Sequence, residues 1–151
     1  MSKWNTADWK ALCSGEVCPI CLSGKPLGIV AELSAAFVTS SPDSPMRGYC
    51  CLVLKRHAVE LHELDLDEAC ALMRDLQQVS EAVQKITGAV KLNYEVHGNT
   101  IPHLHVHLFP RYKGDPFENG PINPRLIVES PYGPGKFESF RRTLQARLSA
   151  G

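Results

Sequence analysis

Three histidines alternate with apolar residues in one short segment of the chain. His103, His105 and His107 are separated by Leu104 and Val106. Side chains alternate between the two faces of a β-strand, so a strand here would place all three imidazole rings on one face. Helical spacing would instead spread the rings over about 200°. Because buried imidazoles need partners and add little to a core, the pattern indicates a functional site.

Two kinds of chemistry fit a strand of this kind. Imidazole is a frequent zinc ligand, so the histidines could hold a catalytic metal. A neutral imidazole nitrogen can also attack phosphorus and form a phosphoramidate, which water then opens. The second reaction requires a fixed partner for the other ring nitrogen and donors for the phosphate oxygens. A solvent-exposed strand that merely happens to be rich in histidine explains the regular spacing least well.

The residues that precede the histidines favour attack on a phosphate. Gly98 allows a close backbone approach. Asn99 and Thr100 can present backbone and side-chain donors beside the histidines, as an anion-binding turn does. A site that only bound metal would not need these donors, although the three residues alone would describe an ordinary turn.

A second group of chemistry-bearing residues lies near the N-terminus. Cys18 and Cys21 have the Cys-x-x-Cys spacing of a zinc knuckle. No βαβ pattern typical of a redox pair surrounds them, and free thiols in a loop are the alternative. A zinc site would need two more ligands, for which histidine is the natural residue type, and His57 and His103 are the candidates.

Composition limits the classes of function. Lys plus Arg and Asp plus Glu are both 16, and this balance argues against broad binding of nucleic acid polymers. No apolar run approaches the roughly 20 residues of a membrane span, and the N-terminus lacks an apolar signal-peptide region. We therefore expect a cytoplasmic location, no membrane association and reduced thiols. Cys50, Cys51 and Cys70 lie among apolar neighbours and are predicted to be buried.

The patterns predict one α+β domain over residues 1–151 with a mostly antiparallel sheet. An N-terminal zinc-knuckle loop is expected at about 13–26 and a C-terminal extension at about 112–151. Strands are expected at 28–33, 36–39, 49–54, 89–96 and 103–109, and helices at 7–12, 65–87 and 137–148. The long helix has a capping box at Asp65 and Glu68 and ends at Gly88. Its predicted apolar stripe comprises Leu66, Ala69, Met73, Leu76, Val79, Val83 and Ile86.

The histidine segment resembles the histidine-triad (HIT) superfamily. Residues 103–109 match its signature, in which three histidines alternate with apolar residues, and the likeness extends roughly from Cys18 to Arg111. It is greatest to small bacterial-type members described as diadenosine polyphosphate hydrolases or nucleotide-binding proteins. The resemblance implies a HIT-like fold with one long helix plus a C-terminal helix, and a homodimer built through a shared sheet.

The resemblance also implies roles for individual residues. His105 would be the nucleophile, and His107 would contact the α-phosphate or bridging oxygen and assist the leaving group. Substrate-binding positions of the family fall on Asn93, Gly98, Asn99 and Thr100, as well as on His107. The implied substrate is a nucleotide, most naturally an adenine nucleotide, and no organic cofactor is implied.

A subset of the family holds structural zinc with a Cys-x-x-Cys pair, a distal histidine and the first triad histidine. The resemblance thus implies a Zn²⁺ site of Cys18, Cys21, His57 and His103. Four protein ligands would leave no open position for catalysis.

The chain departs from the family pattern at two places. Gly48-Tyr49 stands where many members have Gly-His, and Asn99 stands where one branch carries Gln. These departures bear on substrate preference and not on the nucleophile.

We therefore expect an enzyme that attacks the α-phosphate of dinucleoside polyphosphates or nucleoside phosphoramidates through a covalent nucleotidyl-histidine. Two alternatives stay open at this point. One is a zinc metallohydrolase that uses the histidine strand as ligands, and the other is a nucleotide-binding module without turnover.

Overall fold

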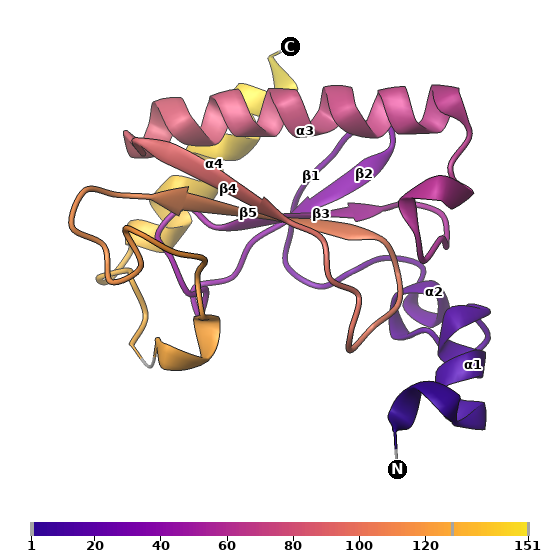
Figure 1. The fold of residues 1–151 in the computed structure, drawn as a ribbon. Coiled ribbons are helices and arrows are strands. Elements are labelled where there is room, and N and C mark those ends of the chain that lie inside the picture. The colour runs from indigo at the N-terminus through magenta and orange to yellow at the C-terminus, as the bar shows by residue number, and fades with distance from the viewer. Residues whose placement is uncertain (1, 128, 151) are drawn as a thin grey trace.

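A five-stranded antiparallel sheet organises the chain (Figure 1). The computed structural model describes residues 2–127 and 129–150. The strands lie in the order β1-β2-β3-β5-β4. Their bounds are β1 Ile29–Glu32, β2 Ala36–Thr39, β3 Cys50–Leu54, β4 Lys91–Glu95 and β5 His105–Arg111. The α-helices are α1 Ala7–Cys13, α2 Pro19–Ser23, α3 Leu66–Thr87 and α4 Lys136–Ser149, and short 3-10 turns lie at Lys3–Asn5, Leu61–Glu63 and Pro124–Leu126.

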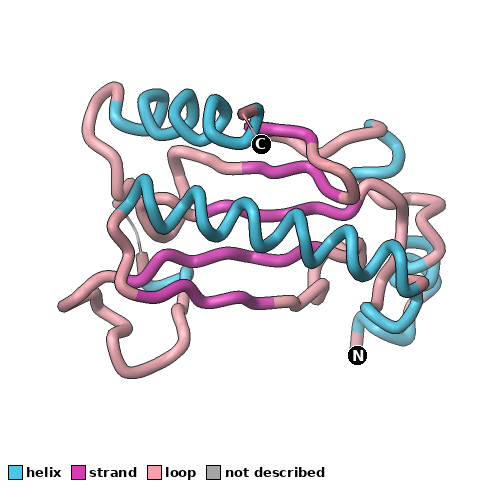
Figure 2. The backbone as a smooth tube through the Cα atoms, turned by 90° about the horizontal axis from the view of Figure 1, so that it is seen from above, coloured by secondary structure: helices cyan, strands magenta, loops and turns pink. Residues whose placement is uncertain are grey.

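α3 covers one face of the sheet, and α4 lies along its β1 edge. Seen from above, α3 runs across the middle of the sheet and α4 lies beside it toward β1 (Figure 2). The main core fills the space between the sheet and the two helices with apolar side chains from β1, β2, β3, β5, α3 and α4. The fold is therefore the single-domain α+β arrangement that the sequence predicts. The face of the sheet opposite α3 carries the cavity described below. No helix within residues 2–127 and 129–150 combines the length and the apolar character that a membrane crossing requires.

The central strand pair carries the histidines. All five residues of β3 are buried, as its apolar run predicts, and β3 pairs with β5 so that Cys51 lies opposite His107 and Val53 opposite His105. The predicted strand 103–109 is wrong at its start, because β5 begins at His105. His103 lies before the strand, where Leu104 N–H donates to the carbonyl of Ala58. The three rings therefore do not share one pocket.

The predicted apolar stripe of α3 is confirmed in its second half, where Val79 and Val83 are buried and Leu76 and Ile86 pack against the core. It is wrong nearer the start of the helix, where Leu66 and Met73 are exposed at 77% and 55% and Leu72 is buried instead. Asp75 lies on the same face of the helix as Leu72. Its carboxylate is buried and accepts the N–H groups of the β1–β2 turn at Ala35 and Ala36, at 2.7 and 3.0 Å, which fixes one helix face against the sheet. A buried carboxylate is tolerated there because it is hydrogen-bonded.

Two further sequence expectations need correction. The predicted loop at 13–26 contains the short helix α2, which begins at Pro19 and ends at a left-handed Gly24. Cys50 and Cys51 are buried as predicted, but Cys70 is exposed. Cys70 is exposed because it lies one turn from Met73, on a helix face that points to solvent.

Candidate active site and metal centre

A large cavity lies on the face of the sheet opposite α3. Its volume is about 1030 Å³, and His105 and His107 line its floor on β5. The loop after β4 forms one side, and the C-terminal segment around Pro121–Arg125 forms another. All the substrate residues suggested by the sequence line this cavity: Asn93, Gly98, Asn99, Thr100 and His107.

The His105 ring has a fixed orientation. Its Nδ1 lies 2.6 Å from the backbone oxygen of His103. A carbonyl oxygen only accepts hydrogen bonds, so Nδ1 must carry the proton. Within residues 2–127 and 129–150, Nε2 has no hydrogen-bond partner. The nitrogen beside the cavity therefore holds a free lone pair, as a nucleophile requires.

The His107 ring lies against His105 and is packed between aromatic side chains. The two imidazoles meet edge to face with centroids 4.7 Å apart, and Phe109 stacks on His107 at 5.8 Å. The Tyr49 hydroxyl lies 2.7 Å from His107 Nδ1. Burial lowers the pKa of His107 to about 4, with smaller contributions from His105 and His97, so the ring is neutral at pH 7.

The side-chain amide of Asn93 is oriented from behind by Arg111. Arg111 is only 6% exposed, and its Nη1 donates to the Asn93 Oδ1 at 2.8 Å. A guanidinium has no acceptor, so the amide oxygen must face it and the NH₂ group is left toward the cavity. Asp115 pairs with the same guanidinium, whose hydrogen bond lowers the pKa of the Asp115 carboxyl to about 2. The hydrogen bonds and the ion pair of Arg111 are thus made inside the protein, and its charge does not steer substrate.

The loop after β4 supplies small and polar groups. Gly98 has φ +72°, a left-handed backbone that glycine adopts at low cost. His97 is exposed, lines the cavity and contacts Glu95 at 2.8 Å. The Lys3 ammonium donates to the backbone oxygen of Asn99, so the N-terminal segment supports this loop.

His62 lies on the surface, as expected from the sequence.

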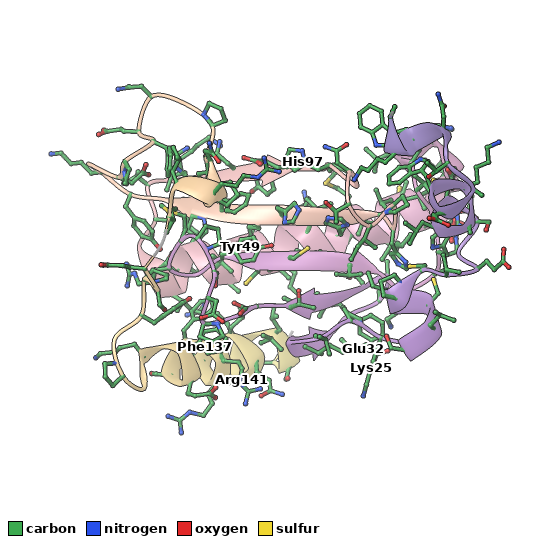
Figure 3. All side chains as sticks on the ribbon, turned by 90° about the horizontal axis from the view of Figure 1, so that it is seen from below. Lys25, Glu32, Tyr49, His97, Phe137 and Arg141 are labelled. Atoms are coloured by element: carbon green, nitrogen blue, oxygen red, sulfur yellow. The ribbon has the colours of Figure 1, made fainter. Side chains whose placement is uncertain are left out.

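A second, smaller cavity adjoins the first. Its volume is about 520 Å³, and both cavities share Ser41 and Tyr49 as lining residues. Figure 3 shows this face from below, with Tyr49 between His97 on one side and Phe137 and Arg141 of α4 on the other. Phe137 and Arg141 line the smaller cavity. The C-terminal extension therefore lines both cavities, the larger one with residues 121–125 and the smaller one with Phe137 and Arg141.

A Cys/His cluster lies beside the start of β5. The ligand atoms of Cys18, Cys21, His57 and His103 all lie within 4.8 Å of one another. Closer pairs include the two imidazole Nδ1 atoms at 3.3 Å and the Cys18 Sγ and His103 Nδ1 at 3.5 Å. The structure therefore brings together the four residues that the sequence nominates as metal ligands, from α2, the end of β3 and the residue before Leu104.

Hydrogen bonds behind the cluster prepare the two imidazoles for a metal. His103 Nε2 donates to the Leu54 carbonyl and His57 Nε2 donates to the Cys13 carbonyl, each at 2.8 Å. Both Nδ1 lone pairs then face each other, which is unfavourable unless a cation lies between them. Burial lowers the pKa of His103, which favours the neutral, metal-binding form. The cluster fits a divalent cation with nitrogen and sulfur ligands.

Sequence reasoning did not foresee the contacts that orient the active-site side chains. In the sequence, Tyr49 stood out only as a departure from the family pattern, and no local pattern predicts that its hydroxyl contacts His107. The Arg111 and Asp115 spacing of four residues is a signal for a local ion pair, but the link to Asn93 depends on β4–β5 pairing.

A family model for the HIT domain matches residues 29–114. Since that match covers more than half of the chain, the protein belongs to the HIT domain family. A histidine triad protein from Marinobacter aquaeolei VT8 has a similar solved structure, with a TM-score of 0.68 and 26% identity over 81% of this chain and 88% of that one.

Two relatives from Schizosaccharomyces pombe are each 33% identical to the chain. The asymmetrical bis(5′-nucleosyl)-tetraphosphatase aligns with 58% of this chain and 50% of its own length. The adenosine 5′-monophosphoramidase aligns with 62% of this chain and 71% of its own length. The chain thus spans about half the length of the first relative.

The protonation of His107 provides a test of this geometry. In an NMR titration the ring should protonate with a midpoint near pH 4, below the ordinary 6.5. An unfolded chain would protonate this ring first, so the stability contributed by the neutral ring is lost as the pH falls from 6.5 toward 4. The signal is identified by its absence from a His107→Gln variant. A midpoint at or above 6.5 would contradict the burial of the ring.

Proposed function

We propose that the protein is a nucleotide hydrolase or transferase that attacks the α-phosphate of dinucleoside polyphosphates or nucleoside phosphoramidates. The observation that carries this proposal is the bond from His105 Nδ1 to the His103 carbonyl at 2.6 Å. It leaves the Nε2 lone pair beside a cavity large enough for a nucleotide. The two relatives with tetraphosphatase and phosphoramidase names support this substrate class.

The reaction would proceed by two displacements on phosphorus. His105 Nε2 forms the nitrogen–phosphorus bond while the bond to the leaving group breaks and its electron pair departs with that group. Water or another acceptor then attacks the nucleotidyl-histidine and frees the ring. The Asn93 amide, the backbone and side chains of residues 98–100 and the His107 ring would contact the phosphate oxygens. Whether water or a second substrate arrives decides between hydrolase and transferase.

The smaller cavity is a suitable place for the nucleoside. It opens beside the phosphate position and is lined by apolar groups such as Leu27, Ile29 and Phe137. Ser41 lines both cavities, so its hydroxyl group is placed to bind the ribose. Apolar walls with a few convergent polar groups are what a base and sugar require.

For the Cys/His cluster we propose structural Zn²⁺. Two thiolates and two neutral imidazoles form a closed four-ligand set, and four of the six separations between their ligand atoms, at 3.3 to 3.6 Å, are those of a tetrahedral shell. Bound there, the ion would tie α2 to the start of β5. His105 and His107 lie outside the cluster, which favours the covalent route over a metallohydrolase that uses the triad as ligands.

The open edge of β4 is the proposed dimer surface. β4 is the last strand of the sheet, and the apolar side chains of Val90, Tyr94 and Val96 along it are exposed at 68%, 48% and 47%. An exposed apolar edge strand is costly unless another strand covers it. A second copy, paired antiparallel, would extend the sheet across both chains.

Rapid quench with nucleotide-labelled diadenosine tetraphosphate tests the covalent step. Acid-labile label should appear on the wild-type protein and be absent from His105→Ala, with AMP release reduced at least about 1,000-fold. His62→Ala is the matched control, because that histidine lies on the surface outside the cavity. Tight nucleotide binding without AMP release would instead identify a binding module, and normal AMP release by His105→Ala would exclude His105 as nucleophile.

Metal content tests the zinc proposal. The purified protein should contain about one zinc per chain, and Cys18→Ser should lose it and unfold at a lower temperature. Cys70→Ser is the matched control, because this thiol is exposed and outside the cluster. Equal zinc content in wild type and Cys18→Ser would contradict the site. Immediate loss of turnover in a chelated but still folded protein would favour the metallohydrolase.

Light scattering tests the dimer. The wild-type protein should have about twice the chain mass of 16.7 kDa. Tyr94→Asp should shift it toward the monomer, because a carboxylate would be buried at the new strand pair. Leu61→Asp changes a similarly exposed apolar side chain away from β4 and should leave the mass unchanged. A wild-type protein that remains monomeric at high concentration would refute the proposal.

A further inference from the structure

Tyr49 makes the closest contact to the second histidine of the cavity. Its hydroxyl oxygen lies 2.7 Å from His107 Nδ1, and the two rings stack with centroids 5.9 Å apart and planes 24° apart. Tyr49 also packs against Phe109 at 4.9 Å. The phenol is thus held against β5, and its hydroxyl contacts His107 Nδ1.

The partners of the two imidazoles differ in kind. His105 Nδ1 faces a backbone carbonyl, which can only accept, whereas His107 Nδ1 faces a hydroxyl, which can donate. Burial raises the pKa of Tyr49, so the phenol keeps its proton at neutral pH. The Cys51 thiol also lies beside the phenol, but its sulfur is a much weaker acceptor than an imidazole nitrogen.

We propose that Tyr49 is a positioning residue that sets the tautomer of His107. The phenol O–H donates to Nδ1, so the His107 proton resides on Nε2. The two rings then present opposite groups to the phosphate: a lone pair on His105 Nε2 and an N–H donor on His107 Nε2. This inference rests on the proposed function, because it assigns a role to Tyr49 in the same reaction.

The donor on His107 stabilises charge without giving up its proton. For an anhydride substrate, the bond from His105 Nε2 to phosphorus forms, the bridging P–O bond breaks, and its electron pair leaves with the departing phosphate. The Nε2–H of neutral His107 hydrogen-bonds to the oxygen on which negative charge grows. Complete transfer of that proton would leave an anionic imidazole, which the neutral phenol could not support.

The tautomer can be measured without any substrate. In ¹⁵N-histidine-labelled protein at pH 7, long-range proton–nitrogen spectra should show His107 with a protonated Nε2 and a bare Nδ1. The His107 signals are assigned by their loss in His107→Gln. In Tyr49→Phe the two nitrogen shifts should move toward each other as both tautomers become populated. A bare Nε2 in the wild type, or shifts unchanged in Tyr49→Phe, would overturn the inference.

Kinetics provide the second measurement. Tyr49→Phe should lower kcat for diadenosine tetraphosphate roughly 10-fold with little change in KM, because the lost donor acts mainly in the transition state. Tyr112→Phe is the matched control: it also loses one hydrogen bond of a phenol, in this case to the Arg47 carbonyl, and Tyr112 does not line the cavity. An unchanged kcat in Tyr49→Phe would refute the role. If the wild type released no AMP, the proposed function would fail while the spectra still decided the tautomer.

Discussion

Residue 103 is the point on which both sites depend. The ring of His103 is buried, with Nε2 donating to the Leu54 carbonyl and Nδ1 in the Cys/His cluster. Its backbone oxygen accepts a hydrogen bond from the Nδ1–H group of His105. One residue thus orients the proposed nucleophile and closes the proposed metal shell. Any shift of its backbone would alter the direction of the His105 ring, because the accepting oxygen would move with it.

This position is held by the central strand pair. β3 and β5 are hydrogen-bonded in the middle of the sheet, and Leu54 N–H donates to the Leu104 carbonyl just before β5 begins. The apolar residues of these strands pack under α3 and α4, while the histidines face the other side. Burial on one face therefore fixes side chains on the opposite face, which is how a rigid sheet supports precise chemistry.

The cavity that we propose binds phosphate has few cations near it. Arg111 is buried and paired with Asp115, so its charge serves the fold. Among the residues that line the larger cavity, Arg125 is basic while Asp43 and Glu95 are acidic. In the proposed reaction, neutral donors would bind the phosphate oxygens, namely the Asn93 amide, the groups of residues 98–100 and an imidazole N–H. Preorganised dipoles can do this in a chain whose formal net charge is zero.

Local pattern by itself predicted the fold class, the five strands, α1, α3 and α4, the histidine constellation and the Cys-x-x-Cys pair, whereas the full set of four cluster residues was implied by the resemblance to the HIT superfamily. It could do so because strand alternation, helix capping and ligand spacing act over a few residues. Tertiary structure alone decided that β5 begins at His105, that α3 turns Cys70 outward, and that Tyr49 reaches His107. These outcomes depend on contacts between distant segments, such as Asp75 with the β1–β2 turn, and no local pattern records such contacts.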